Sequence, residues 1–330
     1  FFLALPAALY LGSETASAKG KKVTASKGSK KGKSNKKSGK KGKSTKTTKR
    51  KTASIVYMYF GDPKFTTLFQ QSVKLSKAMD GYDYTALLYD EKSAIAGIEL
   101  SKKAIKDANE VHSPTERNFI NCIKSLTDKG YMVDIWTFAH GTIGNDGSQF
   151  TAKGSSSDDK YITAKELVDG LGPNTNGGKQ RSIRMVYTVA CYQAAMRSTW
   201  TTIGAKVACG ARDVNYFPNQ FGKFASNWNK GKTFKKSLNE ADTAASRTLV
   251  HPYILADAKS MKKKGVWDGC KFPKTVLGKD SCAKDYFTSR WVARSDWKSG
   301  QSGKEHMIYS SEKLISGDSK VTKSSTPTWN

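Results

Sequence analysis

The chain of 330 residues lacks the short motifs that identify several common enzyme classes. It contains no HExxH or CxxC zinc motif, no GxSxG nucleophile motif and no GxGxxG dinucleotide loop. The stretch at 173–179 lacks the first Gly of a phosphate-binding loop, and Gln180 stands where Ser or Thr is required. No run reaches 18 consecutive apolar residues, the length of a transmembrane helix. These absences argue against zinc catalysis, nucleotide hydrolysis and a membrane-spanning segment in the mature chain.

Acidic residues are absent from residues 19–51, which hold 16 of the 56 Lys and Arg residues. More than half of the formal net charge of +28 therefore lies in a tenth of the length. The segment cannot bury enough apolar area to fold, so we expect a disordered Lys-rich tail. Two roles stay open: a tether to an anionic surface such as envelope phosphate, acidic polysaccharide or nucleic acid, or a plain linker. No aromatic residue lies among the lysines, so no specific nucleic-acid partner is indicated.

The first 18 residues have the pattern of a truncated signal peptide. The sequence FFLALPAALYLG is apolar but too short to span a bilayer, and Ala16 and Ala18 fit the small residues before a cleavage site. Cleavage before Lys19 would make the protein secreted or periplasmic, in either case extracytoplasmic. The alternative is a buried or interfacial N-terminal helix.

Apolar runs rich in β-branched and aromatic residues alternate with amphipathic stretches between residues 52 and 270. Ser113 with Glu116, and Thr163 with Glu166, have the spacing of capping boxes that begin helices. The alternation predicts an α/β domain with a mostly parallel sheet covered by helices on both faces. Residues 271–330 have weak periodicity and are expected to form a small β-rich C-terminal extension. The strands are predicted at 54–60, 84–89, 131–139, 181–190 and 205–211.

His140 and Cys191 each directly follow a predicted buried strand. The carboxyl ends of neighbouring parallel strands line one crevice, so the two side chains are expected to meet there. A nearby imidazole lowers the pKa of a thiol and produces the reactive thiolate. We expect residues 192–196 to begin a helix that places the sulfur at its positive end. The backbone N–H groups of Gly141 and Cys191 are candidate donors to an oxyanion.

The two strand ends, VDIWTFAHG and MVYTVAC, resemble the caspase-type clan (clan CD) of cysteine peptidases, which includes caspases, legumains, gingipains and clostripain. The similarity covers about residues 53–250. It implies a caspase-like sheet and a cysteine endopeptidase without a cofactor, with strict preference for one residue type before the scissile bond. Cys191 would be the nucleophile and His140 the acid and base. Val189 stands where some members have an acidic residue or Gln.

In this clan the loop after the next strand often lines the specificity pocket, and here it holds Arg212 and Asp213. Asp213 in the pocket would select Lys or Arg, and Arg212 would select Asp. We favour Asp213, because such an enzyme could also process its own Lys-rich tail. A third possibility is that the two side chains pair with each other or face solvent.

Five cysteines leave one over after pairing, as expected for a reactive nucleophile in an exported chain. Cys270 and Cys282 are the candidates for a disulfide. Cys122 and Cys209 are expected to face the core, either paired or as thiols. No metal site is predicted, since the acidic residues at 146, 158 and 159 are too loosely spaced to define one.

The sequence therefore favours an exported cysteine endopeptidase that acts on protein or peptide substrates. One alternative is a catalytically inactive binding protein of the same fold, tethered to anionic surfaces by its basic tail. Another is an acyl or amide transferase that uses the same pair of residues.

Overall fold

The computed structural model describes residues 50–61, 75–90, 105–144, 147–154, 160–172, 180–212, 215, 220–248 and 311–328. The expected signal peptide, nearly all of the Lys-rich tail, Asp213, Cys270 and Cys282 lie outside these residues, as does the boundary placed between 270 and 271. None of the described helices is both long and apolar enough to cross a membrane.

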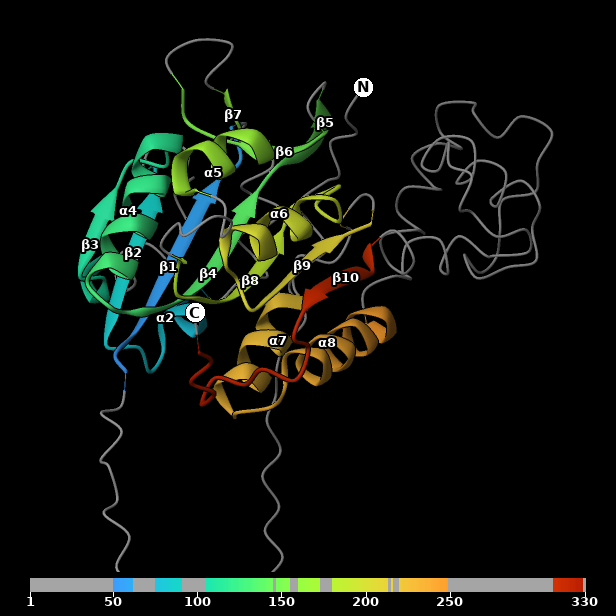
Figure 1. The fold of residues 1–330 in the computed structure, drawn as a ribbon. Coiled ribbons are helices and arrows are strands. Elements are labelled where there is room, and N and C mark those ends of the chain that lie inside the picture. Colours follow the sequence, from blue (N-terminus) through green and yellow to red (C-terminus); the bar gives the residue numbers. More distant parts are fainter. Residues whose placement is uncertain are drawn as a thin grey trace, which may run out of the picture. The chain divides into compact units, whose positions relative to one another are not determined.

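Within the described residues, seven strands form the central sheet in the order β10-β9-β8-β4-β1-β2-β3 (Figure 1). All neighbouring strands are parallel except β10, which runs antiparallel to β9. The predicted mostly parallel α/β sheet is thereby confirmed, and the arrangement is consistent with a caspase-like fold. The strands are β1 (Thr52–Tyr59), β2 (Tyr84–Tyr89), β3 (Glu110–His112), β4 (Met132–Ala139), β8 (Ile183–Val189), β9 (Val207–Ala211) and β10 (Lys313–Gly317).

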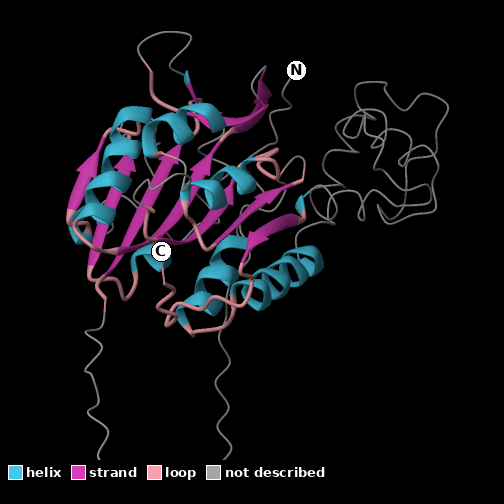
Figure 2. Cartoon of the chain, viewed as in Figure 1, coloured by secondary structure: helices cyan, strands magenta, loops and turns pink. Residues whose placement is uncertain are grey.

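Helices cover both faces of the sheet (Figure 2). Helices α4, α5 and α6 pack on one face, where Phe119, Leu167 and Trp200 are buried in a shared core. Helices α2, α7 and α8 pack on the other face, around Phe224 and Trp228. Because both faces are covered, every residue of β4, β8 and β9 is buried, as continuous apolar runs require. The helices are α2 (Ser76–Met79), α4 (Glu116–Asp128), α5 (Ala164–Leu171), α6 (Met196–Ile203), α7 (Gln220–Asn229) and α8 (Phe234–Thr248).

The segment after His140 is rich in Gly, Ser, Asn and Asp as far as about residue 160, yet it contains strands. Among the described residues, β5 (Gly141–Gly144), β6 (Gly147–Thr151) and β7 (Tyr161–Thr163) form a second, antiparallel sheet. Its Gly, Ser and Asn content gives no apolar alternation, yet Phe150 and Ile162 reach the main core. The short sheet continues β4 and fixes the backbone beside His140.

One of the two predicted helix N-termini is confirmed, and the other was wrong. Thr163 and Glu166 form the expected capping box at the start of α5. The N-cap of α4 is Thr115 and not Ser113, and its hydroxyl accepts the Asn118 backbone N–H at 3.2 Å. The Ser113 prediction was therefore wrong by two residues, because Thr115 offers an equivalent hydroxyl one residue before the helix.

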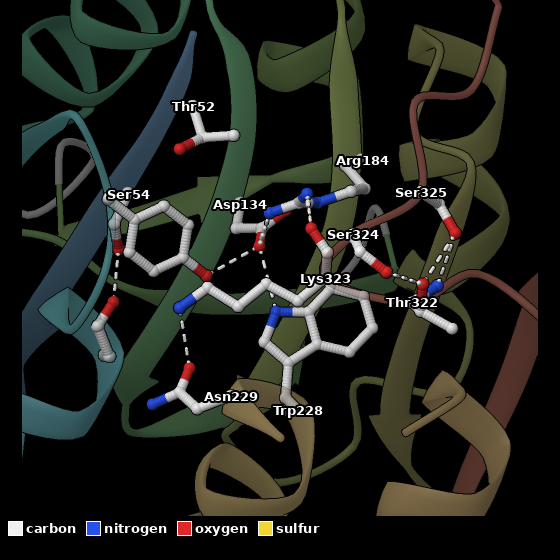
Figure 3. A network of polar contacts seen from close by, with 12 residues as sticks. Thr52, Ser54, Asp134, Arg184, Trp228, Asn229, Thr322, Lys323, Ser324 and Ser325 are labelled. Carbon is white, nitrogen blue, oxygen red and sulfur yellow. Dashed lines mark hydrogen bonds and ion pairs between the residues drawn. The ribbon is translucent and has the colours of Figure 1, made fainter. Parts of the chain in front are cut away.

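Asp134 and Arg184 form an ion pair that is 0% exposed near the amino ends of β4 and β8 (Figure 3). Both guanidinium contacts are short, at 2.8 and 2.6 Å. Asp134 also accepts hydrogen bonds from Tyr82 Oη at 2.6 Å and from Trp228 Nε1 at 3.0 Å. Arg184 further donates to the backbone carbonyl of Lys323. The network therefore joins the sheet, α7 and the C-terminal residues at the edge opposite Cys191.

Candidate active site

Strands β4 and β8 are neighbours, and their ends bring His140 and Cys191 to one edge of the sheet. Phe138 of β4 pairs with Val189 of β8 in parallel register. His140 lies two residues beyond Phe138, and Cys191 lies two beyond Val189. Both residues therefore follow the carboxyl ends of neighbouring parallel strands, where reactive groups collect in open α/β sheets.

Gly141 lies directly against the backbone of Cys191. A Cβ atom added at Gly141 would be 2.0 Å from the Cys191 carbonyl oxygen and 2.7 Å from its nitrogen. Only a residue without a side chain allows this approach. The structure thus places the backbone that follows His140 against Cys191, although 50 residues lie between the His and the Cys in the chain.

Gly141→Ala should destabilise the protein by about 1–3 kcal/mol, since backbone atoms would have to move to admit the methyl group. The matched control is Gly222→Ala on α7, where an added Cβ meets only Lys77 Nζ at 3.9 Å. The control should be neutral or stabilising by up to about 1 kcal/mol. Urea unfolding midpoints measure both changes. Equal midpoints for the two variants would contradict the close packing of Gly141 on Cys191.

The residues after Cys191 form a turn, and the expectation that they begin a helix was wrong. Tyr192 has a φ of 57°, and α6 starts only at Met196. The sulfur therefore does not sit in the first turn of a helix. A left-handed residue at 192 interrupts the run of helix-favouring residues, and tertiary contacts stabilise it.

Side chains and backbone from β6 and β9 hold this turn. Ser148 Oγ donates to the Tyr192 carbonyl, and Gln193 Nε2 donates to the Gln149 carbonyl at 3.0 Å. The Ala194 N–H donates to the Ala211 carbonyl at 2.9 Å. The turn that carries Cys191 is thus fixed from both sides.

The Cys191 sulfur accepts a hydrogen bond from the Asn215 backbone N–H at 3.3 Å. A donor aimed at sulfur favours the thiolate over the thiol, because it stabilises the charged form. Cys191 as a whole residue is half-buried. No pattern in residues 212–219 indicated this contact.

His140 is half-buried, and burial lowers the pKa of its imidazole from the usual value near 6.5. The ring is therefore neutral at pH 7 and able to accept a proton. Its backbone is held by Thr151, whose hydroxyl accepts the His140 N–H at 3.2 Å and whose N–H donates to the His140 carbonyl at 2.9 Å. Thr151 Oγ1 in turn donates to the Tyr59 carbonyl at 2.7 Å, which ties His140 to the end of β1.

The two candidate specificity residues have different outcomes. Arg212 forms an ion pair with Glu312 at 2.6 Å, and its backbone N–H donates to the Glu312 carbonyl at 3.0 Å. Its charge is thereby matched by a carboxylate one residue before β10. Asp213 lies outside the described residues.

Cys122 and Cys209 are buried thiols outside any disulfide. Burial raises the pKa of Cys209 to about 12, and that of Cys122 still further. Both thiols are thus protonated at neutral pH and are poor nucleophiles.

A buried lysine near the site, Lys313, was not found from the sequence. It is 4% exposed at the first position of β10, where it pairs in register with Ala211. Residues 271–330 were expected to be β-rich, but their weak periodicity located no individual strand, and only the fold brings this residue to the edge that carries Cys191.

Among the residues that the structure describes, no group of three or more His, Cys, Asp or Glu side chains could hold a metal ion. No protein-family model matches the chain, and no curated protein matches it either.

Proposed function

We propose that the chain is an exported cysteine endopeptidase of the caspase-type clan, with Cys191 as nucleophile and His140 as general acid and base. The observation that carries this proposal is the packing of Gly141 on Cys191, which is so close that a Cβ atom added at Gly141 would be 2.0 Å from the Cys191 carbonyl oxygen. This packing supports the proposal because it holds the end of β4, with His140, beside the end of β8, with Cys191. The apolar segment before Lys19 supports export.

The reaction begins with transfer of the Cys191 thiol proton to the neutral imidazole of His140. The thiolate attacks the peptide carbonyl carbon, and the oxyanion that forms is stabilised by the N–H groups of Gly141 and Cys191. His140 then gives its proton to the leaving amine as the C–N bond breaks. Water activated by His140 hydrolyses the thioester and restores the thiol.

Preference for a basic residue before the scissile bond rests on Asp213. The pairing of Arg212 with Glu312 supports this choice, because it reduces the capacity of Arg212 to bind an acidic side chain. A basic preference would also allow the enzyme to cleave its own Lys-rich segment at 19–51.

Reporter peptides with Arg, Lys, Asp or Asn before the cleavable bond test the function and the preference together. We expect hydrolysis after Arg and Lys at least about tenfold faster than after Asp or Asn, as a charged pocket discriminates by about 1.4 kcal/mol or more. Cleavage only after Asp would contradict the proposal that Asp213 lines the specificity pocket. Hydrolysis of none of the four, with binding to anionic vesicles retained, would instead favour the tethered binding protein. Transfer of the acyl group to an added amine would identify a transferase.

A further inference from the structure

A buried polar cluster lies on the α7 and α8 side of the sheet, next to the Cys191 turn. Lys313 Nζ donates to Gln220 Oε1 at 3.1 Å, and Gln220 Nε2 donates to Asp242 Oδ1 at 2.6 Å. Gln220 thus bridges a cation on β10 and a carboxylate on α8. Gln220 is 2% exposed, so the connection is shielded from water.

The cluster is connected to Cys191 through the backbone. Lys313 pairs with Ala211 across β9 and β10, and the Ala211 carbonyl accepts the Ala194 N–H of the Cys191 turn. Lys313 therefore lies on the strand next to the one that holds the Cys191 turn, and the negative charge of a Cys191 thiolate raises the pKa of Lys313.

Two uncharged side chains, Gln220 and Tyr187, lie against the Lys313 ammonium group. The ammonium group has three N–H donors, and it lies 5.7 Å from the centroid of the Tyr187 ring with Gln220 as its hydrogen-bond acceptor. Burial lowers the pKa of Lys313, whereas Cys209, Asp242 and Cys191 raise it. A buried cation of this kind is stabilised by any anion that forms nearby.

We propose that Lys313 is a positioning residue that stabilises the Cys191 thiolate through space, and that the charge state of Asp242 regulates the strength of this effect. This inference rests on Cys191 as the nucleophile of the proposed peptidase. Lys313 acts on the sulfur and not on the substrate.

The direction of the regulation follows from the charges. Burial and Glu312 raise the pKa of Asp242 to about 7, although Lys313 lowers it. Below that pH Asp242 is neutral, so the field of Lys313 acts on Cys191 undiminished. Above it the carboxylate offsets Lys313 and disfavours the thiolate. The other titratable groups here, Cys209 and Tyr187, stay protonated because burial raises the pKa of each.

The test is the pH dependence of Cys191 alkylation by iodoacetamide, followed by mass spectrometry of the peptide that contains Cys191. Lys313→Met should slow alkylation at pH 6.5 by on the order of tenfold, since a buried unit charge shifts a thiol pKa by about one unit. Asp242→Asn should speed alkylation about threefold at pH 8, with little change at pH 5.5.

Lys323→Met is the matched control. Lys323 is a half-buried lysine that donates to Asn229 in the network at the opposite edge of the sheet. The control should leave the pH profile of Cys191 unchanged.

A folded Lys313→Met variant with the wild-type profile would overturn the inference. If that variant fails to fold, Asp242→Asn decides, and a profile identical to wild type at every pH would overturn the inference. Alkylation needs no peptide substrate. A failure of the inference about Lys313 can therefore be distinguished from an absence of peptidase activity.

Discussion

Cys191→Ala should abolish hydrolysis of the reporter peptides, with a loss on the order of 10⁴-fold or more, because the attacking atom is removed. The urea unfolding midpoint should stay close to that of the wild type, since Cys191 is half-buried and only one atom is lost.

His140→Ala should lower the hydrolysis rate by about 10²–10⁴-fold through loss of the acid and base. Both rates are measured with the preferred reporter peptide.

Cys209→Ala provides the matched control for this prediction. Cys209 is 1% exposed and lies in β9, on the α7 and α8 side of the sheet. Its loss should cost about 1 kcal/mol of stability while hydrolysis per folded molecule persists. If Cys191→Ala still hydrolyses the peptide, Cys191 is not the nucleophile, whatever the stability of the variant.

Asp134→Ala should lower the free energy of unfolding by about 3–5 kcal/mol. The substitution leaves the Arg184 guanidinium buried without its carboxylate and removes the acceptor of Tyr82 and Trp228 (Figure 3). Domains are typically stable by only about 5–15 kcal/mol, so this loss is a large share of the total. Urea denaturation followed by Trp fluorescence measures the change.

Lys165→Met is the matched control for the ion pair. Lys165 and Asp169 form an exposed pair at positions i and i+4 of α5, with side chains 74% and 59% exposed. Removal of such a pair should cost less than about 0.5 kcal/mol. If Asp134→Ala costs no more than the control, the buried network does not hold the C-terminal residues onto the sheet.

Five of the seven strands of the main sheet could be predicted, because each is a mainly apolar run between clear turn signals. Every residue of β4 and β8 is buried, so the apolar composition of each strand indicates a buried strand without knowledge of the segments that pack against it. The same local signal placed His140 and Cys191 at strand ends. The juxtaposition of the two residues was therefore within reach of sequence reasoning.

The details of the site depend on contacts between distant segments, which have no local pattern. The left-handed Tyr192 replaces an expected helix because Ser148 and Ala211 bind the turn backbone. Lys313 reaches the site only because β10 pairs antiparallel with β9. The short strands after His140 are rich in Gly and polar residues, so their sequence resembles that of a loop.

The central claim is that His140 activates the thiol of Cys191, and the alkylation rate of Cys191 at pH 6.5 tests it most directly. An ordinary thiol with a pKa near 8.5 is only about 1% ionised at this pH. We predict that Cys191 reacts about tenfold faster than N-acetylcysteine under the same conditions and that His140→Ala removes this advantage. A rate no higher than that of the model thiol, and unchanged by His140→Ala, would contradict the account.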